Sequence, residues 1–216
     1  MHGGHTVSRG IVLGMIGALA LAGCSVEEGA SSAAPTSASP SPSPDGDTDG
    51  DTTSAPFIDA NGAETGTVEL QFDDDRTTLV VEASGLAPGP HGFHIHTIGT
   101  CEPDSADPAA PTISGDFLSA GGHLAKEGQV HSAHDGDLPS LIAAEDGTAR
   151  MTVTTDTLSA QDVLDGDGSA AMIHALADNF RNVPERYAPE GPDEMTNRTG
   201  DSGGRVACAV LTLAAD

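Results

Sequence analysis

The sequence has few basic residues and few aromatic ones. Lys and Arg together number 8 against 33 Asp and Glu, a formal charge of −25 at pH 7, and tryptophan is absent. A protein that binds nucleic acid through charge needs many Lys and Arg to displace phosphate counterions, so this composition excludes that class. The same shortage argues against docking on anionic lipid by charge. Gly (27) and Pro (14) are frequent, which indicates many turns.

Long hydrophobic runs are also missing, except for one near the N-terminus. Residues 11–22 form an uncharged run that is shorter than the roughly 20 apolar residues of a membrane span and is typical of an export signal. The run ends in Leu-Ala-Gly-Cys, which resembles the lipobox of bacterial lipoproteins. We therefore expect residues 1–23 to be a cleaved signal and Cys24 to be lipidated. An ordinary secretory signal with an incidental cysteine is the alternative.

The segment after Cys24 lacks the residues that build a core. Residues 25–56 hold no aromatic side chain and almost no branched aliphatic one, and they are rich in Ser, Pro and Asp. Such a segment cannot bury enough apolar area to offset its ordering entropy. We expect residues 24–56 to be a disordered tether and residues 57–216 to be the folded domain. The mature protein is then exported and anchored on the extracytoplasmic face of a membrane.

The expected strands of the domain are short and bounded by turns. Residues 67–72 and 77–82 are candidate strands separated by four polar residues, and this arrangement predicts a hairpin. Later strands are expected at residues 92–97, 148–154, 170–175 and 205–213, with long turn-rich stretches between them. Sustained helical periodicity is absent. The pattern predicts an all-β, antiparallel sandwich or barrel with long functional loops.

Nine histidines occur, and all but His2 and His5 fall in the expected domain. His94 and His96 are two residues apart on an expected strand, so their side chains share one face, which suits two ligands of one metal ion. His131, His134 and Asp137 are spaced three apart, a compact set for a second metal ion. Imidazole suits copper and zinc, and a carboxylate completes a zinc set.

The remaining histidines are spread more widely. His123 follows two glycines on an expected turn, and His174 ends a late expected strand. For any single histidine, a hydrogen-bonded structural role is the alternative. We assign that role to His91, whose offset from His94 places it on the other face.

The motif His-Gly-Phe-His-Ile-His at residues 91–96 resembles the copper-binding strand of the copper/zinc superoxide dismutases. Four further segments resemble this family in the family's own order: Gly-Gly-His at 121–123, Gly-Asp-Leu at 136–138, His-Ala-Leu-Ala-Asp-Asn at 174–179 and Gly-Gly-Arg-Val-Ala-Cys at 203–208. The resemblance implies an eight-stranded, immunoglobulin-like Greek-key sandwich or barrel with long metal-binding and channel loops.

The resemblance also implies a role for each matching residue. Copper is expected on His94, His96, His123 and His174, and zinc on His123, His131, His134 and Asp137. Asp178 is expected to link a copper histidine to a zinc histidine. Arg205 is expected to position the incoming anion, with Thr199 on the opposite side of the channel.

A disulfide between Cys101 and Cys208 is also implied by the resemblance. The cysteine count agrees, because the sequence has three cysteines and lipidation of Cys24 leaves one pair. An exported domain is where such a bridge persists.

One feature departs from the family pattern. Only two residues separate His131 from His134, whereas the family's loop is longer at this place. Spacing of three residues still allows both rings to bind one ion. Copper-only relatives with a shortened zinc region also exist in the family. We expect zinc besides copper, and hydrogen-bonded His131, His134 and Asp137 are the alternative.

The implied activity is conversion of superoxide to dioxygen and hydrogen peroxide, with copper cycling between Cu(II) and Cu(I) and His123 carrying a proton. An anionic protein then needs a local region of positive charge to attract an anionic substrate. Half of its basic residues fall in one late stretch, namely Arg181, Arg186, Arg198 and Arg205.

The rival interpretation is a surface lipoprotein that sequesters copper or zinc without turnover. Storage would not require Arg205, Thr199 and Asp178. The sequence leaves the oligomeric state open, a homodimer included.

Overall fold

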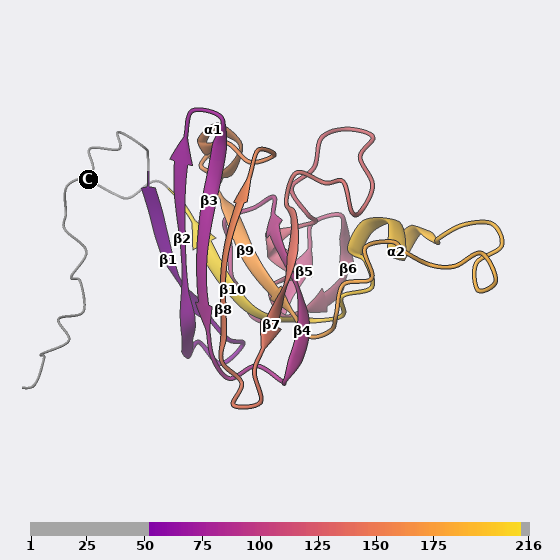
Figure 1. Ribbon diagram of the computed structural model, residues 1–216, viewed down its shortest axis with the longest axis horizontal. Helices are drawn as coiled ribbons and strands as arrows, with labels where there is room; N and C mark the ends of the chain where they lie inside the picture. The colour runs from indigo at the N-terminus through magenta and orange to yellow at the C-terminus, as the bar shows by residue number, and fades with distance from the viewer. Residues whose placement is uncertain (1–51, 213–216) are drawn as a thin grey trace, which may run out of the picture. The chain divides into compact units, whose positions relative to one another are not determined.

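The computed structural model describes residues 52–212, and Figure 1 shows its strands and short helices. Eight antiparallel strands close into a barrel in the order β1-β10-β9-β4-β7-β8-β3-β2, and β5 and β6 form a separate two-stranded sheet. This confirms the expected all-β, eight-stranded architecture. The expected signal, the lipidation site Cys24 and the tether up to residue 51 lie outside the described residues.

The strands of the barrel are β1 (Thr52–Ile58), β2 (Glu64–Asp73), β3 (Arg76–Ala83), β4 (Gly89–His96), β7 (Asp137–Ala143), β8 (Ala149–Thr155), β9 (Ser169–His174) and β10 (Arg205–Leu211). The connections carry β5 (Ser105–Asp107), β6 (Ala110–Gly115), a 3-10 helix η1 (Leu118–Ala120) and two short helices, α1 (Ala160–Val163) and α2 (Glu194–Thr199). Among the described residues, no helix has the length and apolar character needed to cross a membrane.

The first strand corrects the expected start of the domain. β1 begins at Thr52 and pairs with β2 from Thr52 opposite Gln71 onward. Thr53, Ala55 and Phe57 are buried and alternate with exposed neighbours. Residues 52–56 therefore belong to the barrel and not to the tether.

On the neighbouring strands β4 and β9, successive side chains point to opposite faces of the sheet. This places the core residues on one face and the candidate metal ligands on the other. In β4, Phe93 and Ile95 are fully buried members of the main core cluster, so His94 and His96 project from the opposite face. In β9, Ile173 belongs to the same core, and His174 lies on the other face. The candidate residues are thus on the outside of the barrel wall, beneath the long connections.

A second, smaller cluster of apolar residues lies beneath the β4–β7 connection. It contains Phe117, Ala120, Ala170, Met172 and Cys208, all with exposed fractions of 0%. Cys208 is bonded to Cys101, so the implied disulfide is present. The bridge ties the start of this connection to β10.

Candidate metal centre

Strand pairing brings four histidines from distant parts of the chain together. β4 lies between β7 and β9, which places His94 opposite Met172 and His96 opposite Ala170. An isolated bridge joins His96 to His123, in the connection after η1. His174 ends β9. The four rings are buried, with exposed fractions of 0–8%.

Each of these four rings directs one nitrogen at a protein acceptor, which sets its orientation and tautomer. The pairs are His94 Nε2 with Asp178 (2.8 Å), His96 Nδ1 with the carbonyl oxygen of Gly121 (2.9 Å), His123 Nδ1 with Asp137 (2.8 Å) and His174 Nδ1 with the carbonyl oxygen of Gly203 (3.2 Å).

The opposite nitrogens of the same rings form the first donor set, comprising His94, His96, His123 and His174. Their candidate ligand atoms all lie within 4.8 Å of one another. His94 Nδ1 is buried without a hydrogen-bond partner, and the Nε2 atoms of His96 and His174 are 3.4 Å apart. Buried nitrogens of this kind fit a metal ion, because an unpaired buried acceptor is otherwise costly. Four imidazoles are a donor set that suits copper.

A second donor set adjoins the first and consists of His94, His123, His131 and Asp137, again with all candidate atoms within 4.8 Å of one another. His131 Nδ1 is buried without a hydrogen-bond partner and lies 3.1 Å from Asp137 Oδ1. His134 Nδ1 lies 3.2 Å from Asp137 Oδ2. The short spacing thus still gathers all the expected zinc residues around one carboxylate.

Asp178 joins the two donor sets. Its carboxylate accepts hydrogen bonds from His94 Nε2 and from His131 Nε2, both at 2.8 Å. The family resemblance of the sequence implied this link between a copper histidine and a zinc histidine through Asp178. The backbone N–H of Phe180 also donates to the carboxylate.

Helix α2 packs against Asp178 and His131. The residue that allows this close packing is Gly200, which the sequence analysis did not identify. Gly200, directly after α2, has φ +58, and a Cβ there would lie 2.1 Å from Asp178 Oδ1 and 2.3 Å from His131 Nε2. The carbonyl oxygen of Asn197 accepts the backbone N–H of His131 at 2.9 Å. Glycine is required at this position because only hydrogen fits there. The available signal was a glycine at the end of a capped helix.

Arg205 starts β10 opposite His174. Its guanidinium shares the Gly121 carbonyl oxygen with His96 of the first donor set. It donates to the carbonyl oxygens of Phe117 and Gly121. Both partners are neutral, and among the described residues no carboxylate forms a salt bridge with Arg205. Its charge therefore remains available to an anion. Burial lowers its pKa to about 10, which keeps it cationic at neutral pH.

Burial also sets the protonation of the rings in the metal-free protein. It holds the pKa values of His96 and His174 well below the usual range, and it lowers the pKa of His123 to about 3 despite the neighbouring Asp137. At neutral pH these three rings are uncharged and can act as ligands. Burial also lowers the pKa of His131, but its contacts with Asp137 and Asp178 outweigh that effect and raise it to about 9.

Two further residues take positions apart from the donor sets. The ring nitrogens of His91 lie 2.6 Å from the carbonyl oxygen of His174 and 2.7 Å from that of Ala87, so this buried ring has the structural role expected of it. Thr199 ends α2, and its hydroxyl donates to the carbonyl oxygen of Met195.

The sequence profile of the family described as copper/zinc superoxide dismutase (SODC) matches residues 64–211. The chain belongs to this family. The Cu-Zn superoxide dismutase of Mycolicibacterium paratuberculosis is 44% identical over 159 residues, which are 70% of each chain. That of Deinococcus radiodurans is 34% identical over 170 residues, which are 74% of this chain and 84% of the relative.

Solved structures share the fold of this chain. The Cu/Zn superoxide dismutase from Brucella abortus is 28% identical with a TM-score of 0.58, over 74% of this chain and 99% of that one. A SOD-like protein from Bacillus subtilis is 29% identical with a TM-score of 0.58, over 73% of this chain and 97% of that one. The family uses copper and zinc, and both donor sets fit these metals.

Replacing Asp178 with asparagine is expected to weaken zinc binding by about 10- to 100-fold while copper remains bound. Asparagine lacks the negative charge and replaces one carboxylate oxygen with an NH2 group that can only donate, so the hydrogen bonds from His94, His131 and the Phe180 N–H cannot all be kept. Competition with a chromogenic chelator measures the zinc affinity, and Asp74→Asn is a matched control on an exposed carboxylate. Unchanged zinc affinity in Asp178→Asn would contradict the role of the link.

Zinc binding at pH 7 is expected to release one proton from His131, because zinc competes with a ring proton whose pKa is about 9. This group alone makes the apparent zinc affinity rise about tenfold per pH unit and level off above pH 9. Titration calorimetry in buffers of different ionisation enthalpy counts the protons. Copper binding provides the comparison, since His96, His123 and His174 are already uncharged and release none. Copper binding that releases as many protons as zinc binding would contradict this prediction.

Proposed function

We propose that the protein is a superoxide dismutase that acts outside the cytoplasm and converts two superoxide ions and two protons into dioxygen and hydrogen peroxide. One observation carries the proposal: Arg205, which forms no salt bridge among the described residues, stands beside a four-imidazole donor set and shares the Gly121 carbonyl oxygen with His96. A site that only stores a metal ion does not require a cationic side chain directed at an anionic substrate.

The donor sets support an assignment of residues to each metal. His94, His96, His123 and His174 would hold copper, which would supply one-electron chemistry through its Cu(II) and Cu(I) states. His123, His131 and Asp137 of the second donor set would hold zinc, with His134, whose Nδ1 lies 3.2 Å from Asp137 Oδ2, as the fourth ligand. His123 belongs to both donor sets, and its Nδ1 lies against Asp137.

The protein's own groups then attract the substrate and manage protons. Arg205 draws the anion to the first donor set and orients it by charge and by its fixed guanidinium plane. His123 Nε2 takes up and returns the proton that the peroxide product needs.

The test is superoxide decay with the full chain in detergent, loaded with copper and zinc. We expect decay near the diffusion limit that slows as salt screens the attraction of the anion. The control is the same preparation without copper. If stoichiometrically bound copper produces no acceleration, the metal-sequestering lipoprotein is the function that survives.

The proposed location rests on the sequence of residues 1–24. We propose cleavage before Cys24, lipidation of its thiol and anchoring on the extracytoplasmic face. The disulfide between Cys101 and Cys208 supports an oxidising compartment. Labelling of the cells with a radioactive fatty acid is expected to mark the protein, and to fail to mark Cys24→Ser. Label retained in Cys24→Ser would refute this anchor.

A further inference from the structure

One short turn sets the place of both Arg205 and a ring of the first donor set. The turn is η1 with its two flanking residues, residues 117–121. Arg205 donates to the carbonyl oxygens at its two ends, Phe117 and Gly121. The Gly121 oxygen also accepts the hydrogen bond from His96 Nδ1. A displacement of this turn therefore moves the cation relative to the donor set.

Two hydrogen bonds within the turn, from the N–H groups of Ala120 and Gly121, leave the N–H of Ser119 without an acceptor inside the turn. Phe117 precedes η1 in the left-handed region, with φ 61, a conformation that costs a residue with a side chain about 1 kcal/mol or more. It provides no side-chain cap for the N–H groups at the start of η1. Those groups need acceptors from elsewhere in the chain.

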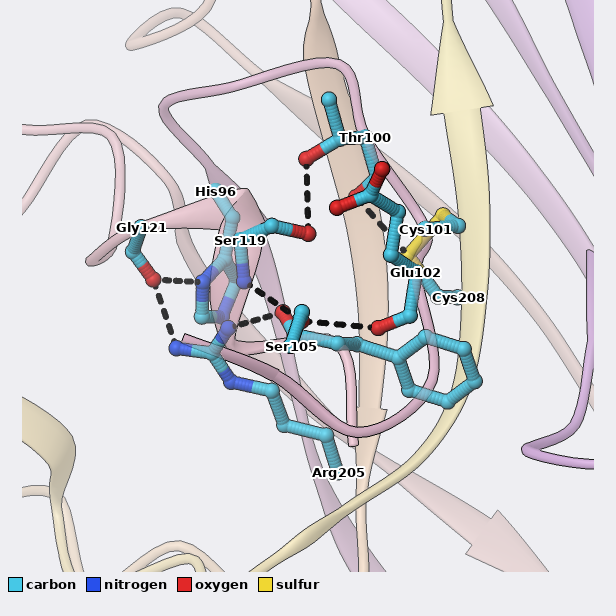
Figure 2. Close-up of a disulfide and its surroundings, with 10 residues drawn as sticks. His96, Thr100, Cys101, Glu102, Ser105, Ser119, Gly121, Arg205 and Cys208 are labelled. Atoms are coloured by element: carbon cyan, nitrogen blue, oxygen red, sulfur yellow. Dashed lines mark hydrogen bonds between the residues drawn. A yellow bond between two sulfur atoms is a disulfide. The ribbon is translucent and has the colours of Figure 1, made fainter. Parts of the chain in front are cut away.

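A serine on β5 supplies the missing acceptor, as Figure 2 shows. Ser105 Oγ accepts the backbone N–H of Ser119 at 2.9 Å and donates to the carbonyl oxygen of Glu102 at 2.8 Å. The same Glu102 oxygen accepts the backbone N–H of Phe117 at 2.9 Å. Thr100 Oγ1 adds a hydrogen bond to Ser119 Oγ at 3.1 Å.

In these contacts the hydroxyl of Ser105 is both a hydrogen-bond donor and a hydrogen-bond acceptor. It bonds the segment next to Cys101 through Glu102 and the turn through Ser119, in parallel with the contact between Thr100 and Ser119. The disulfide fixes Cys101 to β10, the strand that begins with Arg205. A closed path of bonds thus runs from β10 through the bridge and Ser105 to the turn, and back to the Arg205 guanidinium.

We propose that Ser105 is a positioning residue for superoxide, because its hydroxyl fixes the turn that aims Arg205. The inference rests on the proposed function only for the identity of the anion. The arrangement of Ser105, the turn and Arg205 is a property of the metal-free protein.

The first test therefore measures Arg205 without metal. Phenylglyoxal modifies accessible arginines, and peptide mass spectrometry gives a rate for each one. In Ser105→Ala we expect Arg205 to react about five times faster, as the loss of one hydrogen bond allows. Arg150 and Arg198 should keep their rates as internal references. Ser105→Thr, which retains the hydroxyl, is expected to restore the rate, and Ser114→Ala on the neighbouring strand β6 is the matched control.

The second test uses the copper-loaded full chain. Ser105→Ala is expected to bind as much copper as the wild type and to lose about five-fold in kcat/KM at low salt, with a flatter salt dependence. If Ser105 positions Arg205, Ser105→Thr should restore both kcat/KM and the wild-type rate of Arg205 modification by phenylglyoxal. A general loss of structure would not be reversed in both measurements by this substitution. Amide hydrogen exchange of wild-type Ser119, which needs no variant, is expected to be protected.

The outcomes separate the two proposals. Unchanged Arg205 reactivity in a folded Ser105→Ala, or rapid exchange at Ser119, overturns the role of Ser105 whatever the enzyme does. Faster Arg205 modification in Ser105→Ala, combined with no superoxide decay by the wild type, supports the positioning and overturns the proposed function.

Discussion

Replacing both Cys101 and Cys208 with alanine is expected to lower the free energy of unfolding by about 4–5 kcal/mol. The bridge spans 107 residues, and the entropy it removes from the unfolded chain grows with the length of the closed loop. Cys208 is fully buried beside Phe117 and Met172, so alanine is chosen because it adds no polar group there. Urea titrations with the slope fitted separately for each protein give the free energies of unfolding, and their difference measures the loss.

Wild-type protein unfolded in the presence of dithiothreitol is the control for this prediction. Its midpoint should approach that of the double variant, because both lack the bridge and differ only in two sulfur atoms. A midpoint of Cys101→Ala/Cys208→Ala equal to that of the oxidised wild type would show that the bridge contributes nothing to stability. We also expect the double variant to lose activity beyond its folded fraction, since the bridge holds the connection that positions Arg205.

The sequence was informative where side-chain alternation is strong. The hairpin of β2 and β3 was predicted because Val68, Leu70 and Phe72 alternate with polar residues, and all three are buried. β1 was missed because its buried positions include Thr53 and Ala55, whose small size hides the alternation. β7 was missed because Pro139 interrupts it and a bulge in the facing β4 shifts the register between His91 and Phe93.

The same contrast holds in the site. The side chains that could hold metal were identifiable, because imidazoles two or three residues apart are rare and chemically distinctive. Their backbone partners were not, since every residue carries a carbonyl and only the folded chain selects Gly121 and Gly203 as ring acceptors. The need for Gly200 is likewise a consequence of helix α2 lying against Asp178.

Replacing Arg205 with alanine is expected to reduce kcat/KM for superoxide by about 10- to 100-fold at low ionic strength while copper stays bound. The guanidinium touches the Phe117 and Gly121 carbonyl oxygens and no ring nitrogen, so its loss leaves the donor set in place. Arg205→Lys is the matched control. It keeps the charge but cannot span both carbonyl oxygens as a planar fork, so we expect an intermediate rate.

Ionic strength and pH distinguish attraction by Arg205 from a general disturbance of the site. The chain carries a net charge of −25, so without Arg205 the substrate meets a field that repels it. Added salt should slow the wild type, which depends on local attraction, but should leave Arg205→Ala unchanged or slightly faster by screening the repulsion. The wild-type rate should also fall as pH rises through about 10, where Arg205 loses its proton, and Arg205→Ala should lack that step. Stopped-flow decay of superoxide across salt and pH measures both, and a variant that retains the wild-type rate at low salt would remove Arg205 from the mechanism.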